Sequence, residues 1–271
     1  MKIPLEDGYT DVIAKAQRGL GLADSTLAEQ SGIELSALKE LKEGTVDPEA
    51  LRGVAAVLGL NGEALVQLAQ GEYQPDVEAP TGLAAFNTPW EDFTVNSYLV
   101  WDPATRDAIV FDTGGDATEV LHTIVAEGLT VRYVLLTHTH VDHVFDLDRV
   151  VGKTGAPVFT PAQEPVEGAA ALEPGQTFSC GSLTVESRLT DGHSPGGTTF
   201  VVSGLEKPIA IVGDAMFAGS MGGAATVWEH ALTNNREKIL TLSPETVLCP
   251  GHGPLTTVAL ESANNPFYPV R

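Results

Sequence analysis

The sequence has little cysteine, little positive charge and no long apolar run, and each shortage excludes a class of protein. Cys180 and Cys249 are the only cysteines among 271 residues, too few and too far apart for a disulfide framework or a thiolate zinc site. Fifteen basic residues face 36 acidic ones, a formal net charge of −21, which disfavours nucleic acid and anionic membrane as partners. Nitrogen and oxygen atoms must therefore hold any metal ion.

Apolar residues make up 43% of the chain, enough to fill the core of a folded, globular protein. No stretch approaches the roughly 18 apolar residues of a membrane span. The first ten residues, MKIPLEDGYT, lack the basic and apolar regions of a secretory signal. We therefore expect a cytoplasmic protein without a membrane anchor.

The pattern of the chain changes near residue 78. Residues 1–72 contain short helical patterns and almost no strand pattern, whereas β-rich runs alternate with amphipathic helices from about residue 83. The stretch between them, GEYQPDVEAPTG, is rich in proline, glycine and acidic residues, which is typical of a linker. We predict a small all-α domain at 1–78 and an α/β domain at 79–271.

Within the first part, Ala28, Gly32 and Leu38 are spaced as in two helices joined by a tight turn. Asp47 and Pro48 provide the start of a further helix. Residues 8–72 thus resemble the lambda-repressor/Cro-like helix-turn-helix domain, whose second helix would enter the major groove of DNA. Residues 1–78, however, carry 6 basic and 14 acidic side chains, without the basic footprint that phosphate contacts require. We favour a structural or partner-docking role, with sequence-specific DNA binding as the alternative.

The stretch LLTHTHVDHVF in the second part concentrates potential metal ligands after an apolar strand. His138 and His140 are two apart at the strand end, so both imidazoles point to one face. Asp142 and His143 are consecutive where the chain turns into a helix, expected to run from about Asp142 to Lys153. These two side chains therefore diverge and can reach a second ion.

Three further candidates, His193, Asp214 and His252, each lie at a strand-to-loop transition with glycine beside them. Glycine permits the close backbone approach that a crowded coordination site needs. Five histidines and two aspartates are too many ligands for one tetrahedral zinc ion. They suit two ions that share a carboxylate.

An HxHxDH motif followed by a distant His, Asp and C-terminal His resembles the metallo-β-lactamase superfamily over about residues 83–271. The resemblance implies an α/β fold of the αββα sandwich type and a water that bridges two divalent ions, zinc or alternatively iron or manganese. It also implies three sets of ligands: His138, His140 and His193 for one ion, Asp142, His143 and His252 for the other, and Asp214 bridging both.

Within the superfamily, Asp142 and Asp214 and the tail CPGHGPLTTVALESANNPF resemble short bacterial glyoxalase II-like hydrolases. Nineteen residues follow His252, so we expect no C-terminal glutathione-binding domain. Val144 and Phe145 stand where those hydrolases usually have small residues, and GGAA at 222–225 replaces their common GRTD. The resemblance implies hydrolysis of a thioester or carboxylic ester by a hydroxide that bridges the two ions, with Asp142 as proton shuttle.

Several alternatives and supporting residues accompany this hypothesis. A lactonase, a mononuclear iron persulfide dioxygenase using His138, His193 and Asp214, and a metal-sensing transcriptional regulator are the alternative functions. Asp112 is expected to support a metal-binding histidine, and Phe145 and His230 are candidates to line the pocket. We expect a small-molecule substrate. An anionic thioester would be tolerated because distant surface charge is screened. A homo-oligomer is compatible with the sequence.

Overall fold

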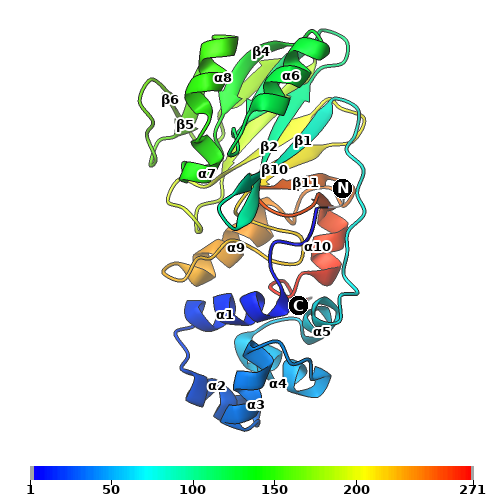
Figure 1. Ribbon diagram of the computed structural model, residues 1–271, viewed down its shortest axis with the longest axis vertical. Helices are drawn as coiled ribbons and strands as arrows, with labels where there is room; N and C mark the ends of the chain where they lie inside the picture. Colours follow the sequence, from blue (N-terminus) through cyan, green and yellow to red (C-terminus); the bar gives the residue numbers. More distant parts are fainter. Residues whose placement is uncertain (1–2, 270–271) are drawn as a thin grey trace.

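Two β-sheets packed face to face form the centre of the protein, as the computed structural model shows for residues 3–269 (Figure 1). Within these residues, the six strands of the first sheet lie in sequence order: β1 (Leu83–Trp90), β2 (Phe93–Trp101), β3 (Asp107–Phe111), β4 (Thr130–Leu135), β5 (Val158–Pro161) and β6 (Ala170–Leu172). The described part of the second sheet also has six strands, again in sequence order: β7 (Thr177–Cys180), β8 (Leu183–Leu189), β9 (Thr198–Ser203), β10 (Ile209–Gly213), β11 (Val247–Pro250) and β12 (Thr256–Thr257).

The alternation of side chains along the strands fills three apolar layers. Ile109 and Phe111 of β3 point into the core between the sheets, where they share a cluster with Ile211 of β10. Their neighbours Val110 and Val212 point to the outer face of the first and the second sheet. Each central strand is therefore buried on both faces, which requires helices on the outside of both sheets.

Helices cover both outer faces, so the predicted αββα sandwich is confirmed. On the first sheet pack α6 (Thr118–Ala126) and α8 (Leu147–Thr154), and on the second α9 (Trp228–Lys238) and α10 (Val258–Asn264) (Figure 1). None of the helices in residues 3–269 combines the length and the apolar character needed to cross a lipid bilayer.

One predicted helix is interrupted. The pattern indicated a continuous helix from about Asp142 to Lys153, but α7 (Val141–Val144) ends before α8 begins. Between them, the Asp146 carboxylate accepts a hydrogen bond from the Ala117 backbone N–H at 2.8 Å. Asp146 also donates its backbone N–H to the Thr113 hydroxyl oxygen at 3.2 Å in place of a helical carbonyl, so the prediction of one helix is wrong.

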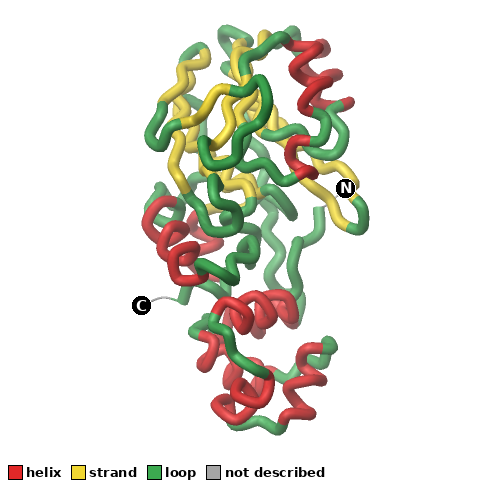
Figure 2. Tube along the Cα trace, turned by 90° about the vertical axis from the view of Figure 1, so that its left-hand side faces the viewer, coloured by secondary structure: helices red, strands yellow, loops and turns green. Residues whose placement is uncertain are grey.

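The first part of the chain is helical, as predicted, and lies beneath the sandwich (Figure 2). Its helices are α1 (Tyr9–Gly19), α2 (Asp24–Ser31), α3 (Leu35–Lys42), α4 (Pro48–Leu58) and α5 (Gly62–Ala69). Asp47 caps α4 by accepting hydrogen bonds from two backbone N–H groups. Gly32, with a φ of 70°, makes the left-handed turn between α2 and α3. The likeness to a lambda-repressor-like domain stays a prediction.

These helices share an apolar core with the second sheet. Val12 of α1 and Leu65 of α5 belong to the same buried cluster as Val212 of β10, Trp228 of α9 and the later Phe267. The division of the chain into two domains at residue 78 stays a prediction, but the contact between the two parts is extensive and apolar.

Candidate metal centre

The seven candidate ligands gather at one end of the sandwich, where strands end and loops begin. His138 and His140 follow β4, and Asp214 follows β10 directly. His252 lies just after β11, which pairs in parallel with β10. The carboxyl ends of parallel strands lie at the same edge of a sheet. The topology therefore brings residues more than a hundred positions apart to one place.

Two groups of side chains result, each compact enough to hold one ion. Within each group the ligand atoms all lie within 4.8 Å of one another, and the groups are His138, His140, His193 and Asp214, and Asp142, His143 and His252. The structure thus brings together all seven predicted residues, with Asp214 in the group of His138, His140 and His193. Their roles as metal ligands, and that of Asp214 as a bridge, stay predictions.

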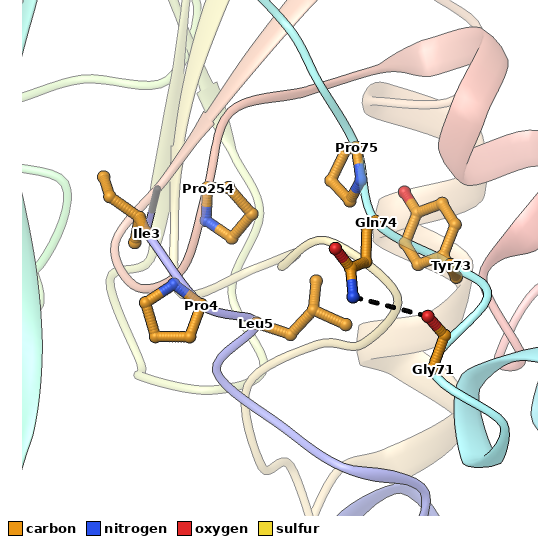
Figure 3. Close-up of a pocket in the computed structure, with 8 residues that line it drawn as sticks. All are labelled: Ile3, Pro4, Leu5, Gly71, Tyr73, Gln74, Pro75 and Pro254. Atoms are coloured by element: carbon orange, nitrogen blue, oxygen red, sulfur yellow. Dashed lines mark hydrogen bonds between the residues drawn. The ribbon is translucent and has the colours of Figure 1, made fainter. Parts of the chain in front are cut away.

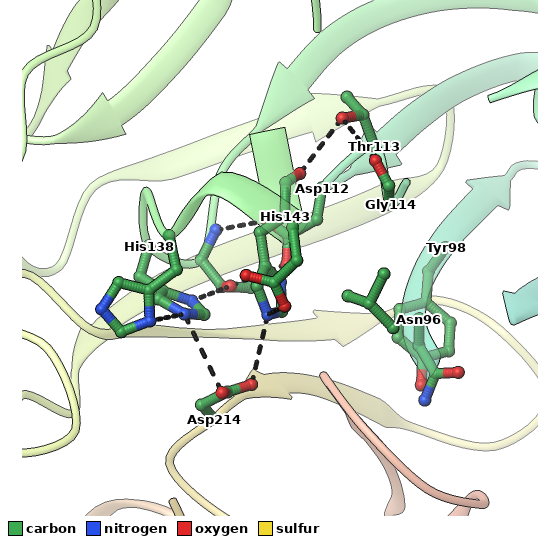
Figure 4. Close-up of polar contacts among 12 residues, drawn as sticks. Asn96, Tyr98, Asp112, Thr113, Gly114, His138, His143 and Asp214 are labelled. Carbon is green, nitrogen blue, oxygen red and sulfur yellow. Dashed lines mark hydrogen bonds and ion pairs between the residues drawn. The ribbon is translucent and has the colours of Figure 1, made fainter. Parts of the chain in front are cut away.

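Asp214 connects the two groups through its two carboxylate oxygens (Figure 4). Its Oδ2 lies 3.3 Å from His193 Nε2 and 4.0 Å from His138 Nε2. Its Oδ1 lies 3.4 Å from His143 Nε2, and Oδ2 also lies 3.4 Å from His252 Nε2. A carboxylate between two sets of imidazoles is the arrangement that a bridging ligand requires.

Two buried atoms in this cluster lack an ordinary partner, which tests whether cations fit. Among the described residues, His143 Nε2 and Asp214 Oδ1 are fully buried and make no hydrogen bond. Unpaired buried polar atoms are rare and call for a specific explanation. His140 Nδ1 also lies 3.1 Å from both His138 Nε2 and His193 Nε2, so lone-pair-bearing nitrogens converge. Two divalent cations, which take imidazole and carboxylate ligands, would supply partners for these atoms.

The protonation tendencies of the cluster reflect the same crowding. Burial and the neighbouring His143 hold the pKa of His138 well below its usual range. Burial also opposes protonation of His143, but the Asp214 and Asp112 carboxylates raise its pKa well above the usual value. Burial raises the pKa of Asp214, but His143 and His252 outweigh it and hold that pKa well below the usual range. The opposite directions at neighbouring groups reflect how strongly burial and close charges act on this cluster.

Asp112, predicted to support a metal ligand, lies behind His143 (Figure 4). Its Oδ2 is 2.9 Å from His143 Nδ1, so His143 presents Nε2 to the site. Thr137 in turn donates to both oxygens of Asp112, from its backbone N–H at 2.8 Å and its hydroxyl at 2.7 Å. The carboxylate is fixed on two sides, and with it the orientation of the imidazole.

Glu164 is a supporting residue that the sequence did not reveal. Its carboxylate accepts hydrogen bonds from the backbone N–H of Thr139 at 2.8 Å and of Gly196 at 2.7 Å. Thr139 lies in the loop that carries His138 and His140, and Gly196 lies in the loop that carries His193. Glu164 therefore ties together two loops that carry ligands of the same group.

Glycines allow the loops to approach the ligands. A Cβ atom on Gly251 would lie 2.1 Å from Asp214 Oδ1, and one on Gly222 would lie 2.2 Å from the Asp214 carbonyl oxygen. Neither position has room for a side chain. Asn96 of β2 then holds the loop of His252 by donating to the carbonyl oxygens of Pro250 and Gly253.

The two predicted pocket residues lie outside this cluster. Phe145 is 61% exposed and packs against Trp90, with ring centroids 4.9 Å apart. His230 Nε2 lies 2.8 Å from Asp191 Oδ2, two residues before His193. The rings that flank the ligands are instead Phe93 and Phe217, whose centroids lie 5.3 and 5.5 Å from that of His252.

A cavity of about 360 Å³, away from the metal cluster, lies between the N-terminal segment and the linker (Figure 3). Ile3, Pro4, Leu5 and Pro254 form much of its lining, and Tyr73 is its sole titratable side chain among the described residues. The Tyr73 hydroxyl donates to Glu261, and the described lining contains no group of metal ligands. The metal cluster is therefore the candidate site of reaction.

A profile of the metallo-beta-lactamase superfamily matches residues 90–252, a range that includes all seven clustered side chains. The chain belongs to this superfamily. A probable metallo-hydrolase of Bacillus subtilis, YqgX, is 32% identical over 189 residues, which cover 59% of this chain and 86% of that protein. The helices α1 to α5 lie outside the matched range.

Other relatives in the superfamily have more specific names. Hydroxyacylglutathione hydrolase GloC of Haemophilus influenzae is 26% identical over 66% of this chain and 95% of that protein. The bovine mitochondrial persulfide dioxygenase ETHE1 is 28% identical over 63% of this chain and 70% of that protein. The crystal structure of TTHA1623 in a di-iron-bound form is similar with a TM-score of 0.54 and 27% identity, over 67% of this chain and 99% of that one.

Proposed function

We propose that the protein is a dinuclear metallohydrolase that cleaves a thioester or a related carboxylic ester. The observation that carries this proposal is the Asp214 carboxylate, which lies within 3.4 Å of imidazole nitrogens from both ligand groups while its Oδ1 and His143 Nε2 are buried without hydrogen-bond partners. The similarity to the hydroxyacylglutathione hydrolase of H. influenzae supports the thioester class.

When bound, two divalent ions would lower the pKa of a water molecule towards about 7 and polarise the substrate carbonyl. The side chains of the protein supply the rest. Asp142 Oδ2 lies 3.5 Å from the Nε2 atoms of both His143 and His252, where it can accept the proton of the attacking water and pass it on. Because a thiol has a pKa of about 8.5, a thiolate leaves with little help from an acid.

Apolar rings form part of the pocket at the ligands. Phe93 and Phe217 line the pocket together with His193, Asp214 and His252. Their rings offer a surface for the carbon skeleton of a substrate whose carbonyl lies at the ligands.

The experiment is an assay of purified protein loaded with zinc, iron or manganese, with the bound metal measured by elemental analysis. We expect two ions per chain, hydrolysis of S-acyl thiols, loss of activity on treatment with a chelator and recovery on return of the metal. We propose zinc as the native ion, and the di-iron form of a similar structure makes iron the principal competitor. Failure of the two-ion form to hydrolyse thioesters, aryl esters and lactones would refute the proposal.

The persulfide dioxygenase activity is a second candidate because of the bovine relative. It would need a single iron ion at His138, His193 and Asp214. The second group, Asp142, His143 and His252, is equally well assembled, which favours two ions. Measured stoichiometry of one iron per chain, with oxygen uptake in the presence of a persulfide, would select the dioxygenase instead.

A further inference from the structure

The pocket above the ligands is built in part from the N-terminal helical region. A cavity of about 320 Å³ is lined by Glu6, Asp7 and Lys15, together with the ligands His193, Asp214 and His252. The superfamily profile begins at residue 90. The three N-terminal residues are therefore an addition of this chain to the reaction site.

The N-terminal segment is fixed against the loop that follows His252. The backbone nitrogen of Glu6 lies 3.2 Å from the place where a Cβ atom of Gly253 would stand. Gly253 has a φ of 77°, a left-handed conformation that favours glycine. The approach of Glu6 to the site thus rests on backbone packing next to a ligand.

Lys15 and Asp7 attach the same region to the loop that carries Asp214. Lys15 Nζ donates to the Met221 carbonyl oxygen at 2.8 Å and forms an ion pair with Asp7. Asp7 also accepts a hydrogen bond from the Ser220 hydroxyl at 2.5 Å. The ammonium lies 5.2 Å from the centre of the Phe217 ring. The charges of Lys15 and Asp7 are thus paired with each other, within the N-terminal region itself.

Glu6 differs from these two residues. Its side chain is partly exposed towards the pocket, and within residues 3–269 it takes part in no hydrogen bond or ion pair. A carboxylate beside a substrate pocket offers an acceptor for a cationic or N–H-bearing group. It also repels an anionic group at that position.

We propose that the N-terminal helical region is a substrate-recognition wall, in which Glu6 binds a cationic or N–H-donating group of the substrate away from the scissile bond. Lys15 and Asp7 are positioning residues that hold this wall to the loop of Asp214. The proposal rests on the proposed thioesterase function for the identity of the reaction, but the wall itself can be tested by binding. The proposal gives the helical region a role other than DNA binding, which the net negative charge of this region disfavours.

The kinetic test uses two thioesters of opposite charge, acetylthiocholine and S-acetyl-3-mercaptopropionate. We expect the full-length zinc-loaded protein to prefer acetylthiocholine. Glu6→Gln should raise the KM of the cationic ester about fivefold with little change in kcat, as expected for loss of one partly screened charge pair. Glu6→Lys should reverse the preference. Glu29→Gln, an exposed position on α2, is the matched control and should change neither KM.

The binding test separates this proposal from the proposed reaction. Thiocholine and 3-mercaptopropionate bind metal ions through their thiolates, so their affinities can be measured by calorimetry whether or not any ester is hydrolysed. We expect the ratio of the two affinities to fall in Glu6→Gln and to invert in Glu6→Lys. If no ester is cleaved but the ratio inverts in Glu6→Lys, the proposed hydrolysis is refuted and the proposed recognition role of Glu6 is supported. An unchanged ratio in a Glu6→Lys protein with wild-type melting temperature and metal content would overturn the wall.

Discussion

At the scale of single residues, the site depends on side chains that are held before any ion binds. His143 is fully buried and oriented by Asp112, and Asp112 is itself held by Thr137. A ligand that cannot rotate loses little entropy when it binds a metal ion. The affinity of the centre should therefore depend on residues that touch no ion.

Replacing Asp112 tests this dependence. In Asp112→Asn the amide is a weaker acceptor for His143 Nδ1–H, so we expect metal affinity to fall about 10- to 100-fold. Competition with a chromophoric chelator measures the change. Asp116→Asn, which affects an exposed carboxylate bound to Thr118 and Arg149, is the control. Equal affinities of the two variants would show that Asp112 does not orient the ligand.

The candidate ligands, which the structure brings together, could be picked out from the sequence, whereas much of their environment could not. Histidine is a rare residue type in this chain, and His138 and His140 stand at the end of a strand. In an extended chain, residues that are two apart point to the same face. Glu6 and Glu164 are acidic residues in a chain with 36 of them, so their type carries no signal. Their positions are set by loop packing, which has no periodicity to read.

At the scale of elements, turns at the far end of the sandwich connect the two sheets. Asp102, just after β2, accepts hydrogen bonds from the backbone N–H of Ala104 at 2.8 Å and of Ser182 at 2.6 Å. Ser182 lies in the turn between β7 and β8 of the other sheet. One carboxylate thus links two hairpins that are 80 residues apart.

Acidification should weaken this link. The backbone N–H groups of Ser182 and Ala104 lower the pKa of Asp102 to about 2. Its stabilising effect is therefore present above the unfolded-state value, near pH 4, and is lost as the pH falls towards 2. We expect the melting temperature of Asp102→Asn to decline less than that of the wild type between pH 4 and pH 2. Asp148→Asn, at a solvated position of α8, should keep the wild-type slope.

The elements themselves were predicted well where local pattern decides them. Strand alternation acts within a few residues and indicates the layers of the sandwich, and the Asp47 cap likewise marks the start of α4 in the N-terminal region. The division between α7 and α8 coincides with the contact of Asp146 with the distant segment of Thr113 and Ala117. No local pattern contains that contact, because it joins segments distant in the chain.

At the scale of the whole molecule, the helical region and the hydrolase fold meet through a close contact of α1 with α9. A Cβ atom on Gly19 would lie 2.2 Å from the Trp228 ring. The absence of a side chain at position 19 is what allows the two helices to pack at this distance.

Adding one methyl group there should disturb both stability and recognition. Gly19→Ala forces α1 away from Trp228, and we expect a loss of about 1–3 kcal/mol in the free energy of unfolding. Because Lys15 lies on α1 and ties Asp7, next to Glu6, to the same helix, the preference between cationic and anionic probes should also weaken. Gly152→Ala, on α8 with no atom within 4 Å of the new Cβ, should leave both unchanged or raise stability slightly. Denaturant unfolding and the binding ratio measure the two effects.

Metal removal should affect the whole fold. The ions would bind the native state and meet dispersed ligands in the unfolded chain. At a free ion concentration of about 1,000 times Kd this stabilises the protein by about 4 kcal/mol, or on the order of 10 °C in melting temperature. Calorimetry with and without chelator measures the shift. An unchanged melting temperature would mean that no ion is held by the native cluster.

The contact of Lys15 with the Met221 carbonyl joins positions 206 residues apart. Contacts of such separation form slowly because a long loop must close first. On the ribosome, α1 to α5 are synthesised long before α9 and α10, against which their apolar face packs. The helical region therefore emerges with an uncovered apolar surface. This surface can be covered only after α9 and α10 have been synthesised. The docking of the helical region and the completion of the pocket therefore become a single event at the end of synthesis.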